Sequence, residues 1–288
     1  MTMSIQNIHK IGIVGAGQMG AGIAQVAAMA GYSCAVTDIR SDALDVGARS
    51  VHKSLSKLAT KGLIKDHNEI MNRIHWHADM DRLSHCDVVI EAVVENEHIK
   101  TEVLRALDVV LKEDAIIASN TSSISITRLA NATVRPEKFI GMHFMNPVPL
   151  MKLVEIIRGH STNSETVEVI TALALKMGKV PTLAADYPGF ITNRVLAPMI
   201  NEAFFALMEG VALAEDIDTS MRLGCNFPMG PLTLADFIGL DTCLAIMEVM
   251  HRGLGEDKYR PCPLLRKYVE AGLLGRKSGQ GVFKYSNE

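Results

Sequence analysis

The order of apolar and polar positions predicts two kinds of structure in succession along the chain. Up to about residue 186, short runs rich in Val, Ile and Ala alternate with longer stretches whose apolar residues recur at helical spacing. The runs that predict strands are residues 10–15, 33–39, 87–93, 115–120, 139–144, 152–157 and 179–186. Such alternation predicts α/β architecture: a doubly wound, mostly parallel Rossmann-type sheet with crossover helices on both faces.

The pattern changes after Tyr187-Pro188-Gly189. The apolar positions that follow keep helical spacing almost to the end, over residues 190–210, 214–224, 231–250 and 262–272. A chain of 288 residues is also long enough to form two cores. We therefore predict an α/β domain over residues 1–187 and a smaller, all-helical domain over residues 188–288.

Composition and charge narrow the possible partners. A net charge of −3 provides no basic excess for nucleic acid. No charged residue lies between Lys10 and Asp38, a stretch long enough to cross a bilayer, but its glycines and its change of apolar period fit a strand, a turn and a helix better. The N-terminus lacks the pattern of a secretory signal, so we expect a cytoplasmic protein that binds no membrane. The five cysteines form no C-x-x-C pair, and we predict neither a disulfide framework nor a metal site.

A glycine-rich turn follows the first predicted strand and opens a predicted helix. It has the pattern G-x-G-x-x-G, formed by Gly15, Ala16, Gly17, Gln18, Met19 and Gly20. In this setting the first glycine permits the tight turn, the second lets the backbone approach a pyrophosphate, and the third lets the helix pack on the strand. The turn therefore predicts a dinucleotide site, although a glycine turn can also serve packing alone.

Asp38 closes the second predicted strand, 23 residues after Gly15. A carboxylate there accepts hydrogen bonds from an adenosine ribose and repels a 2′-phosphate, which favours NAD over NADP. Arg40 could weaken that preference, unless it is simply an exposed loop residue.

A histidine and a glutamate, His143 and Glu155, interrupt the apolar segment 141–157. From the residues alone, His143 is either a hydrogen-bonded core residue or a catalytic base. In a doubly wound sheet the ligand lies beyond the carboxyl ends of the strands, where the strand at residues 139–144 ends. If residues 152–157 run back antiparallel, Glu155 meets the imidazole from the neighbouring strand.

Three polar residues are further candidates for the same site. Asn120 and Ser122 leave the end of the strand at residues 115–120, so we expect both near the nicotinamide end of a cofactor, although a helix-capping loop would use the same residue types. Asn193 lies in the first turn of the predicted helix that opens the second domain, where it either reaches a substrate or is exposed to water.

Six segments together resemble the short-chain (S)-3-hydroxyacyl-CoA dehydrogenase family, over nearly the whole chain and in the same order. The segments are GAGQMGAGIAQ, IEAVVENEHIK, IIASNTSSISI, GMHFMNPVPLMKLVEII, PGFITNRVLAPMINEA and GRKSGQGVFKYS. The resemblance implies NAD-dependent interconversion of a short-chain (S)-3-hydroxyacyl-CoA and a 3-oxoacyl-CoA, in a homodimer formed through the C-terminal domain. An acyl-CoA is then the substrate.

The resemblance also implies roles for individual residues. His143 is implied to be the catalytic base, oriented by Glu155, and Ser122 and Asn193 to contact the substrate oxygen or hold the catalytic group. Glu95 and Lys100 are implied to line the cofactor groove, although both would otherwise be exposed residues at a helix start. Histidine suits the reaction, because a group that titrates near neutrality can take the proton of a secondary alcohol and return it.

Four lysines recur at intervals of four, namely Lys53, Lys57, Lys61 and Lys65, and form a loose basic stripe if the segment is helical. Because the family binds coenzyme A, Ser54, Lys57 and Lys61 are candidates to bind its phosphates, while a solvated helix face is the simpler alternative.

Two other functions fit parts of the pattern. A related dehydrogenase of a free 3-hydroxy acid or sugar acid would use the same base, and fold alone does not separate the two. A regulator that binds NADH without catalysis would need neither His143 nor Glu155.

Overall fold

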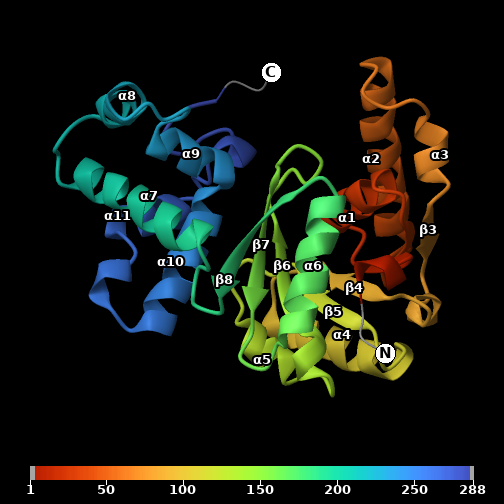
Figure 1. Ribbon diagram of the computed structural model, residues 1–288. Helices are drawn as coiled ribbons and strands as arrows, with labels where there is room; N and C mark the ends of the chain where they lie inside the picture. The colour runs from red at the N-terminus through yellow and green to blue at the C-terminus, as the bar shows by residue number, and fades with distance from the viewer. Residues whose placement is uncertain (1–3, 286–288) are drawn as a thin grey trace. The chain divides into compact units, whose positions relative to one another are not determined.

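The computed structural model describes residues 4–285, which form two compact units that meet between Tyr187 and Pro188. In the first unit, the described residues form an eight-stranded sheet in the order β3-β2-β1-β4-β5-β6-β7-β8 (Figure 1). The strands are β1 (Lys10–Val14), β2 (Ser33–Thr37), β3 (Ile74–His77), β4 (Val88–Glu91), β5 (Ile116–Ser119), β6 (Phe139–Phe144), β7 (Leu153–Arg158) and β8 (Val180–Ala185). All neighbouring strands pair parallel except β6 and β7, so the predicted doubly wound, mostly parallel fold is confirmed.

Helices cover both faces of this sheet. They are α1 (Gln18–Met29), α2 (Ser41–Thr60), α3 (His67–Met71), α4 (Glu97–Val110), α5 (Ile126–Ala130) and α6 (Ser164–Lys176). The apolar side chains of α1, α2 and α6 share one core with alternate strand residues such as Ile11 and Ile13. On the other face α5 is close to the sheet, because a Cβ at Gly141 would lie 2.9 Å from the side chain of Ile126. Figure 1 shows α6 crossing β6 and β7 on the first face.

An acidic residue anchors the amino end of β4. Asp87 accepts hydrogen bonds from the backbone N–H groups of His9 (2.7 Å) and Lys10 (2.9 Å), and pairs with Lys112 at 2.6 Å. Burial opposes ionisation of this carboxyl, but Lys112 and the two N–H groups outweigh it and lower the pKa of Asp87. The charge therefore stabilises the folded state at neutral pH.

The second unit is helical within the described residues. Its helices are α7 (Thr192–Met208), α8 (Ala214–Gly224), α9 (Pro231–Ile238), α10 (Leu240–Leu254) and α11 (Pro263–Glu270). The helical stretch predicted at 231–250 is two helices, because Gly239 takes a φ of 103° between α9 and α10.

In the first unit, the strand β3 had not been predicted, since its sequence IHWH is too polar to show a strand pattern.

Candidate active site

The glycine-rich turn joins β1 to α1, and its three glycines differ in how much space a side chain would find there. Gly15 has a φ of +102°, and a Cβ there would lie 2.5 Å from the carbonyl oxygen of Ala92. A Cβ at Gly20 would lie 1.8 Å from the carbonyl oxygen of Gly15. At Gly17, by contrast, a Cβ would meet nothing within 4 Å. The turn is therefore closely packed at Gly15 and Gly20 and open at Gly17, which fits a backbone that receives a pyrophosphate.

A cavity of about 390 Å³ adjoins this turn. Its lining comes from the carboxyl ends of β1, β2 and β4, from α2 and α4, and from the segment after β3, and consists of Val14, Gly15, Gly17, Thr37, Asp38, Ile39, Arg40, Ala43, Ala78, Met80, Ala92, Val93, Val94, Ile99 and Val103. Asp38 accepts hydrogen bonds from the backbone N–H groups of Ala16 (2.8 Å) and Arg40 (2.9 Å), which fixes the carboxylate at the rim. The Arg40 guanidinium pairs with Asp42, so its charge is already partnered by a carboxylate.

The histidine and the glutamate meet across two antiparallel strands. In the β6–β7 register His143 lies directly opposite Glu155, and the histidine Nδ1 is 2.8 Å from the glutamate Oε2. Glu155 is 0% exposed and His143 is 8% exposed. A neutral imidazole that donates from Nδ1 to the carboxylate has its lone pair on Nε2. The predicted contact between the two residues is confirmed.

Asn120 ties the end of β5 to the end of β6. Its side-chain oxygen accepts a hydrogen bond from the backbone N–H of Phe144 at 2.9 Å. Since Phe144 follows His143, this bond brings the loop that leaves β5 next to the histidine. Ser122 lies in this loop, half-buried, and its N–H and hydroxyl donate to Glu95 Oε1 at 2.9 and 3.2 Å.

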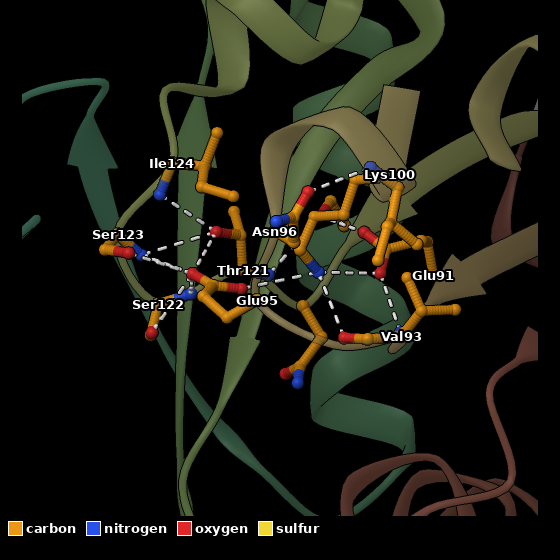
Figure 2. Close-up of polar contacts among 12 residues, drawn as sticks. Glu91, Val93, Glu95, Asn96, Lys100, Thr121, Ser122, Ser123 and Ile124 are labelled. Atoms are coloured by element: carbon orange, nitrogen blue, oxygen red, sulfur yellow. Dashed lines mark hydrogen bonds and ion pairs between the residues drawn. The ribbon is translucent and has the colours of Figure 1, made fainter. Parts of the chain in front are cut away.

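A buried ion pair lies behind this loop (Figure 2). Lys100 Nζ donates to Glu91 Oε1 at 2.7 Å and to the carbonyl of Val93 at 3.3 Å, and lies 3.4 Å from Glu95 Oε2. Lys100 is only 1% exposed and Glu91 is 0% exposed, so the alternative of an exposed lysine is wrong. Among the described residues neither Glu95 nor Lys100 is part of the cavity lining, but Val93, which Lys100 holds, is.

Local sequence explains why a lysine lies inside. Asn96 caps the start of α4 by accepting a hydrogen bond from the N–H of Ile99 at 3.1 Å. Counting from that start, residue 100 falls on the same face as Leu104 and Leu107, the other buried residues of the helix. Burial opposes ionisation of the Glu95 carboxyl, but the Lys100 charge and the donors of residues 121–123 outweigh it and lower the pKa of Glu95.

The far end of the same loop is held by Asp186, which follows β8. Its carboxylate accepts hydrogen bonds from the hydroxyl of Ser125 (2.7 Å) and from the backbone N–H groups of Ile126 (3.0 Å) and Thr127 (2.8 Å). Asp186 therefore caps α5 from a distant strand, and the loop that carries Ser122 is fixed at both ends.

Two family models of known proteins match nearly the whole chain, one in each unit. Residues 10–187 match the family model described as the 3-hydroxyacyl-CoA dehydrogenase NAD binding domain, and residues 189–285 match the model of the C-terminal domain of that enzyme. The chain belongs to the 3-hydroxyacyl-CoA dehydrogenase family. The resemblance seen in the sequence is thereby confirmed, and the first unit is the family's NAD-binding domain.

Three relatives of this 3-hydroxyacyl-CoA dehydrogenase family member illustrate the likeness. A probable 3-hydroxybutyryl-CoA dehydrogenase of Deinococcus radiodurans is 58% identical over 96% of this chain and 100% of its own length. A probable 3-hydroxybutyryl-CoA dehydrogenase of Bacillus subtilis is 53% identical over 98% of this chain and 99% of its own. The crystal structure of (S)-3-hydroxybutyryl-CoA dehydrogenase PaaH1 from Ralstonia eutropha shares 49% identity, covers 98% of this chain and 100% of its own, and superposes with a TM-score of 0.96.

The remaining predicted site residues lie on or next to α2 and on α7. Ser54 and Lys57 are on α2, the serine half-buried and the lysine exposed, and Lys61 directly follows the helix. Because α2 ends at Thr60, only Lys53 and Lys57 of the predicted four-lysine stripe lie within the helix, and Lys65 lies beyond its cap residue Lys61. Asn193 is in the first turn of α7, as expected, and is half-buried.

Glu91 was missed, although a lone carboxylate in the apolar run VVIEAV is the same signal that pointed to Glu155. Within residues 4–285, no group of three or more His, Cys, Asp or Glu side chains could hold a metal ion. Burial raises the pKa of Cys34 to about 12 and that of Cys86 to about 11, so both are poor nucleophiles. A search of the described helices found none that is both long and apolar enough to cross a membrane.

Proposed function

We propose that this protein interconverts a short-chain (S)-3-hydroxyacyl-CoA, such as 3-hydroxybutyryl-CoA, and the corresponding 3-oxoacyl-CoA with NAD. The observation that carries the proposal is the 2.8 Å contact between His143 Nδ1 and Glu155 Oε2, because it prepares Nε2 as a base in a family of dehydrogenases. The names of the relatives support the substrate class.

The proposed proton transfer uses His143 and Glu155. His143 Nε2 takes the proton of the 3-hydroxyl group in oxidation and returns it in reduction. Glu155, bonded to Nδ1, keeps the imidazole in the required tautomer and stabilises the imidazolium that forms. Bound NAD supplies the acceptor or donor of the hydride at C3. Ser122 and Asn193 are proposed to hydrogen-bond the substrate oxygen, which orients C3 for the transfer.

The proposed cofactor site is built from the glycine turn and the rim of the adjoining cavity. Gly15, Gly17, Gln18, Met19 and Gly20 are proposed to receive the pyrophosphate at the start of α1. Asp38 is proposed to accept hydrogen bonds from the adenosine ribose, and Asn120 to lie at the nicotinamide end. The pairing of Arg40 with Asp42 supports NAD over NADP, since a 2′-phosphate would have to compete for that guanidinium.

The proposed site for the coenzyme A phosphates is on α2, at Ser54, Lys57 and Lys61. Both lysine side chains are exposed, Lys57 in the last turn of α2 and Lys61 directly after it. Lys65 offers a matched control, because it is also exposed but lies four residues further from the helix than Lys61.

We also propose a homodimer formed through the helical unit. Several large apolar side chains of that unit are exposed, including Val195, Val211, Leu213, Leu223 and Phe237. Exposed apolar surface of this kind is typical of a protein interface. A monomeric mass in light scattering at micromolar concentration would refute the dimer.

The test of the proposed activity is loss of NADH absorbance with acetoacetyl-CoA, for the wild type and His143→Gln. Free acetoacetate and NADPH are the controls. We expect rapid oxidation of NADH by the wild type with the CoA ester alone, and loss of turnover in His143→Gln while NADH still binds. A folded, NADH-binding wild type that reduces free acetoacetate equally well would favour a free-acid dehydrogenase, and one that reduces neither would favour a non-catalytic NADH-binding protein.

A further inference from the structure

The pair of Glu91 and Lys100 joins the end of β4 to the first turn of α4 and is buried on both sides. Every oxygen of Glu91 is used: Oε1 accepts from Lys100 (2.7 Å) and from the N–H of Val93 (2.8 Å), and Oε2 accepts from the hydroxyl of Ser119 (2.6 Å). Removing two charges from water is costly, and apolar side chains of the same size often stabilise a protein as well. A role beyond stability therefore has to be sought in what the pair touches.

Lys100 of the pair contacts Glu95, and Glu95 holds the loop of residues 120–125, called here the serine loop (Figure 2). Five donors converge on Glu95 Oε1: the hydroxyl of Thr121 at 2.6 Å, the N–H and hydroxyl of Ser122 at 2.9 and 3.2 Å, and the N–H and hydroxyl of Ser123, both at 3.0 Å. The other oxygen, Oε2, faces Lys100 at 3.4 Å. One carboxylate thus joins the buried ammonium group on one side to three consecutive loop residues on the other, through the hydroxyl of Thr121 and the backbone N–H groups of Ser122 and Ser123.

The distances rank these five bonds. A carboxylate oxygen has about two lone pairs, so five donors cannot all be bound equally well. The shortest bonds fix the Thr121 side chain and the backbone of Ser122, whereas the Ser122 hydroxyl has the longest. Glu95 therefore holds the loop firmly by its backbone and retains the Ser122 hydroxyl only weakly, which allows a substrate oxygen to compete for it.

We infer that Lys100 and Glu95 are positioning residues for Ser122. Lys100, anchored on Glu91, fixes the place and the charge of the Glu95 carboxylate, and this carboxylate holds residues 121–123 in the conformation that presents the Ser122 hydroxyl to the substrate oxygen. The inference rests on the proposed function of Ser122 in substrate binding. Lys100 also donates to the carbonyl of Val93, a residue of the cavity wall, so the same side chain links the serine loop to the groove.

The lowered pKa of Glu95 agrees with this arrangement, because Lys100 and the loop donors keep the carboxyl ionised although its environment is partly desolvated. A protonated carboxyl would accept these hydrogen bonds far less strongly than the carboxylate.

The test is a double-mutant cycle with Ser122→Ala, using acetoacetyl-CoA and NADH. Glu95→Gln and Lys100→Met are each made in the wild type and in Ser122→Ala, and kcat, KM and the Kd for NADH are measured. We expect each variant to lower kcat about 10- to 100-fold in the wild type, since small misplacements of a substrate-orienting group have effects of this order. We expect less than about a twofold further loss in Ser122→Ala, and a Kd for NADH within about twofold of that of the wild type.

Lys112→Met is the matched control, because Lys112 pairs with Asp87 at 2.6 Å at the opposite end of β4. Its kcat should stay within about twofold of that of the wild type. If Lys100→Met does not fold, Glu91→Gln/Lys100→Met removes both charges of the pair and replaces it in the cycle, while Glu95→Gln alters a side chain that is 36% exposed.

The outcomes are distinguishable. A loss of kcat that is equally large with and without Ser122 overturns the inference, and so does a Kd for NADH raised about tenfold or more at unchanged kcat, which would make Lys100 a cofactor contact. A wild type without turnover of any CoA ester instead overturns the proposed function, and the inference with it.

Discussion

Replacing Glu155 by glutamine tests whether the proposed base, His143, depends on the charge of its carboxylate partner. The substitution Glu155→Gln keeps the size of the side chain and one acceptor oxygen but removes its charge. In the wild type the carboxylate faces the imidazole at 2.8 Å, and 0% of the residue is exposed to water. The variant therefore lacks the charge that stabilises an imidazolium while the proton is on His143.

The size of the effect follows from this geometry. With 2.8 Å between the bonded atoms, the centres of the two charges lie roughly 4 Å apart, where an effective dielectric constant of about 20 gives about 4 kcal/mol. The amide oxygen can still accept a hydrogen bond from Nδ1, so we take the loss as about 2–4 kcal/mol of transition-state stabilisation. Since 1.4 kcal/mol corresponds to a factor of ten, kcat should fall about 30- to 1000-fold.

The assay is NADH oxidation with saturating acetoacetyl-CoA, accompanied by the Kd for NADH and the Tm of each protein. Glu168→Gln is the control, because Glu168 is an exposed residue of α6 and the chemical change is the same. We expect the control to keep its kcat within about twofold, and Glu155→Gln to retain its NADH affinity. A Glu155→Gln enzyme that folds and keeps kcat within about threefold of the wild type would refute the reasoning.

Three further predictions concern the cofactor turn, the sheet and the substrate phosphates. Gly17→Ala should keep the Tm but weaken NADH binding, because its Cβ meets nothing within 4 Å of the protein, whereas Gly20→Ala, with a Cβ 1.8 Å from a carbonyl oxygen, should lose about 3 kcal/mol or more of unfolding free energy. Asp87→Asn should lower the unfolding free energy by about 1–3 kcal/mol at pH 7 in urea titrations. Because the folded-state pKa of Asp87 is lowered, its contribution is complete above its unfolded pKa of about 3.9 and is lost as the pH falls through the folded value, so the difference from the wild type should shrink in acid. Lys57→Ala/Lys61→Ala should raise KM for the CoA ester about three- to tenfold with kcat unchanged, and an unchanged KM would contradict the phosphate site.

The contact between His143 and Glu155 could be predicted because it depends on one local feature, the antiparallel pairing of two strands that follow each other in the chain. Once residues 152–157 run back beside residues 139–144, strand geometry decides which side chains lie opposite each other. The observed register pairs the two residues directly, and the hydrogen bond between them follows. Their catalytic roles remain predictions, since geometry alone does not demonstrate a reaction.

The support of the serine loop could not be predicted in the same way. Glu91 showed the signal of a carboxylate in an apolar run, but its partner Lys100 comes from a helix, where a lysine at the start is usually exposed. Only the position of Lys100 in line with Leu104 and Leu107 indicates burial, and that indication depends on knowing where α4 begins. The convergence of residues 121–123 on Glu95 depends on the order of β4 and β5 in the sheet, a tertiary feature.

Helix boundaries were predicted less well than the elements themselves. The break at Gly239 was read as part of one helix, because a single glycine is tolerated in a helical pattern and nothing local shows that its φ is positive. The lysine stripe was extended to Lys65 for a similar reason, since the spacing of four continues beyond the end of the helix.

The cap that Asp186 provides for α5 decides where the chain can be divided. The sheet ends with Ala185, so a truncation designed from the strands alone would stop there. Such a fragment would contain all eight strands but would leave the hydroxyl of Ser125 and the N–H groups of Ile126 and Thr127 without their acceptor. A dinucleotide-binding fragment intended for fusion to another substrate domain should therefore end after Asp186. That residue holds the far end of the serine loop in place.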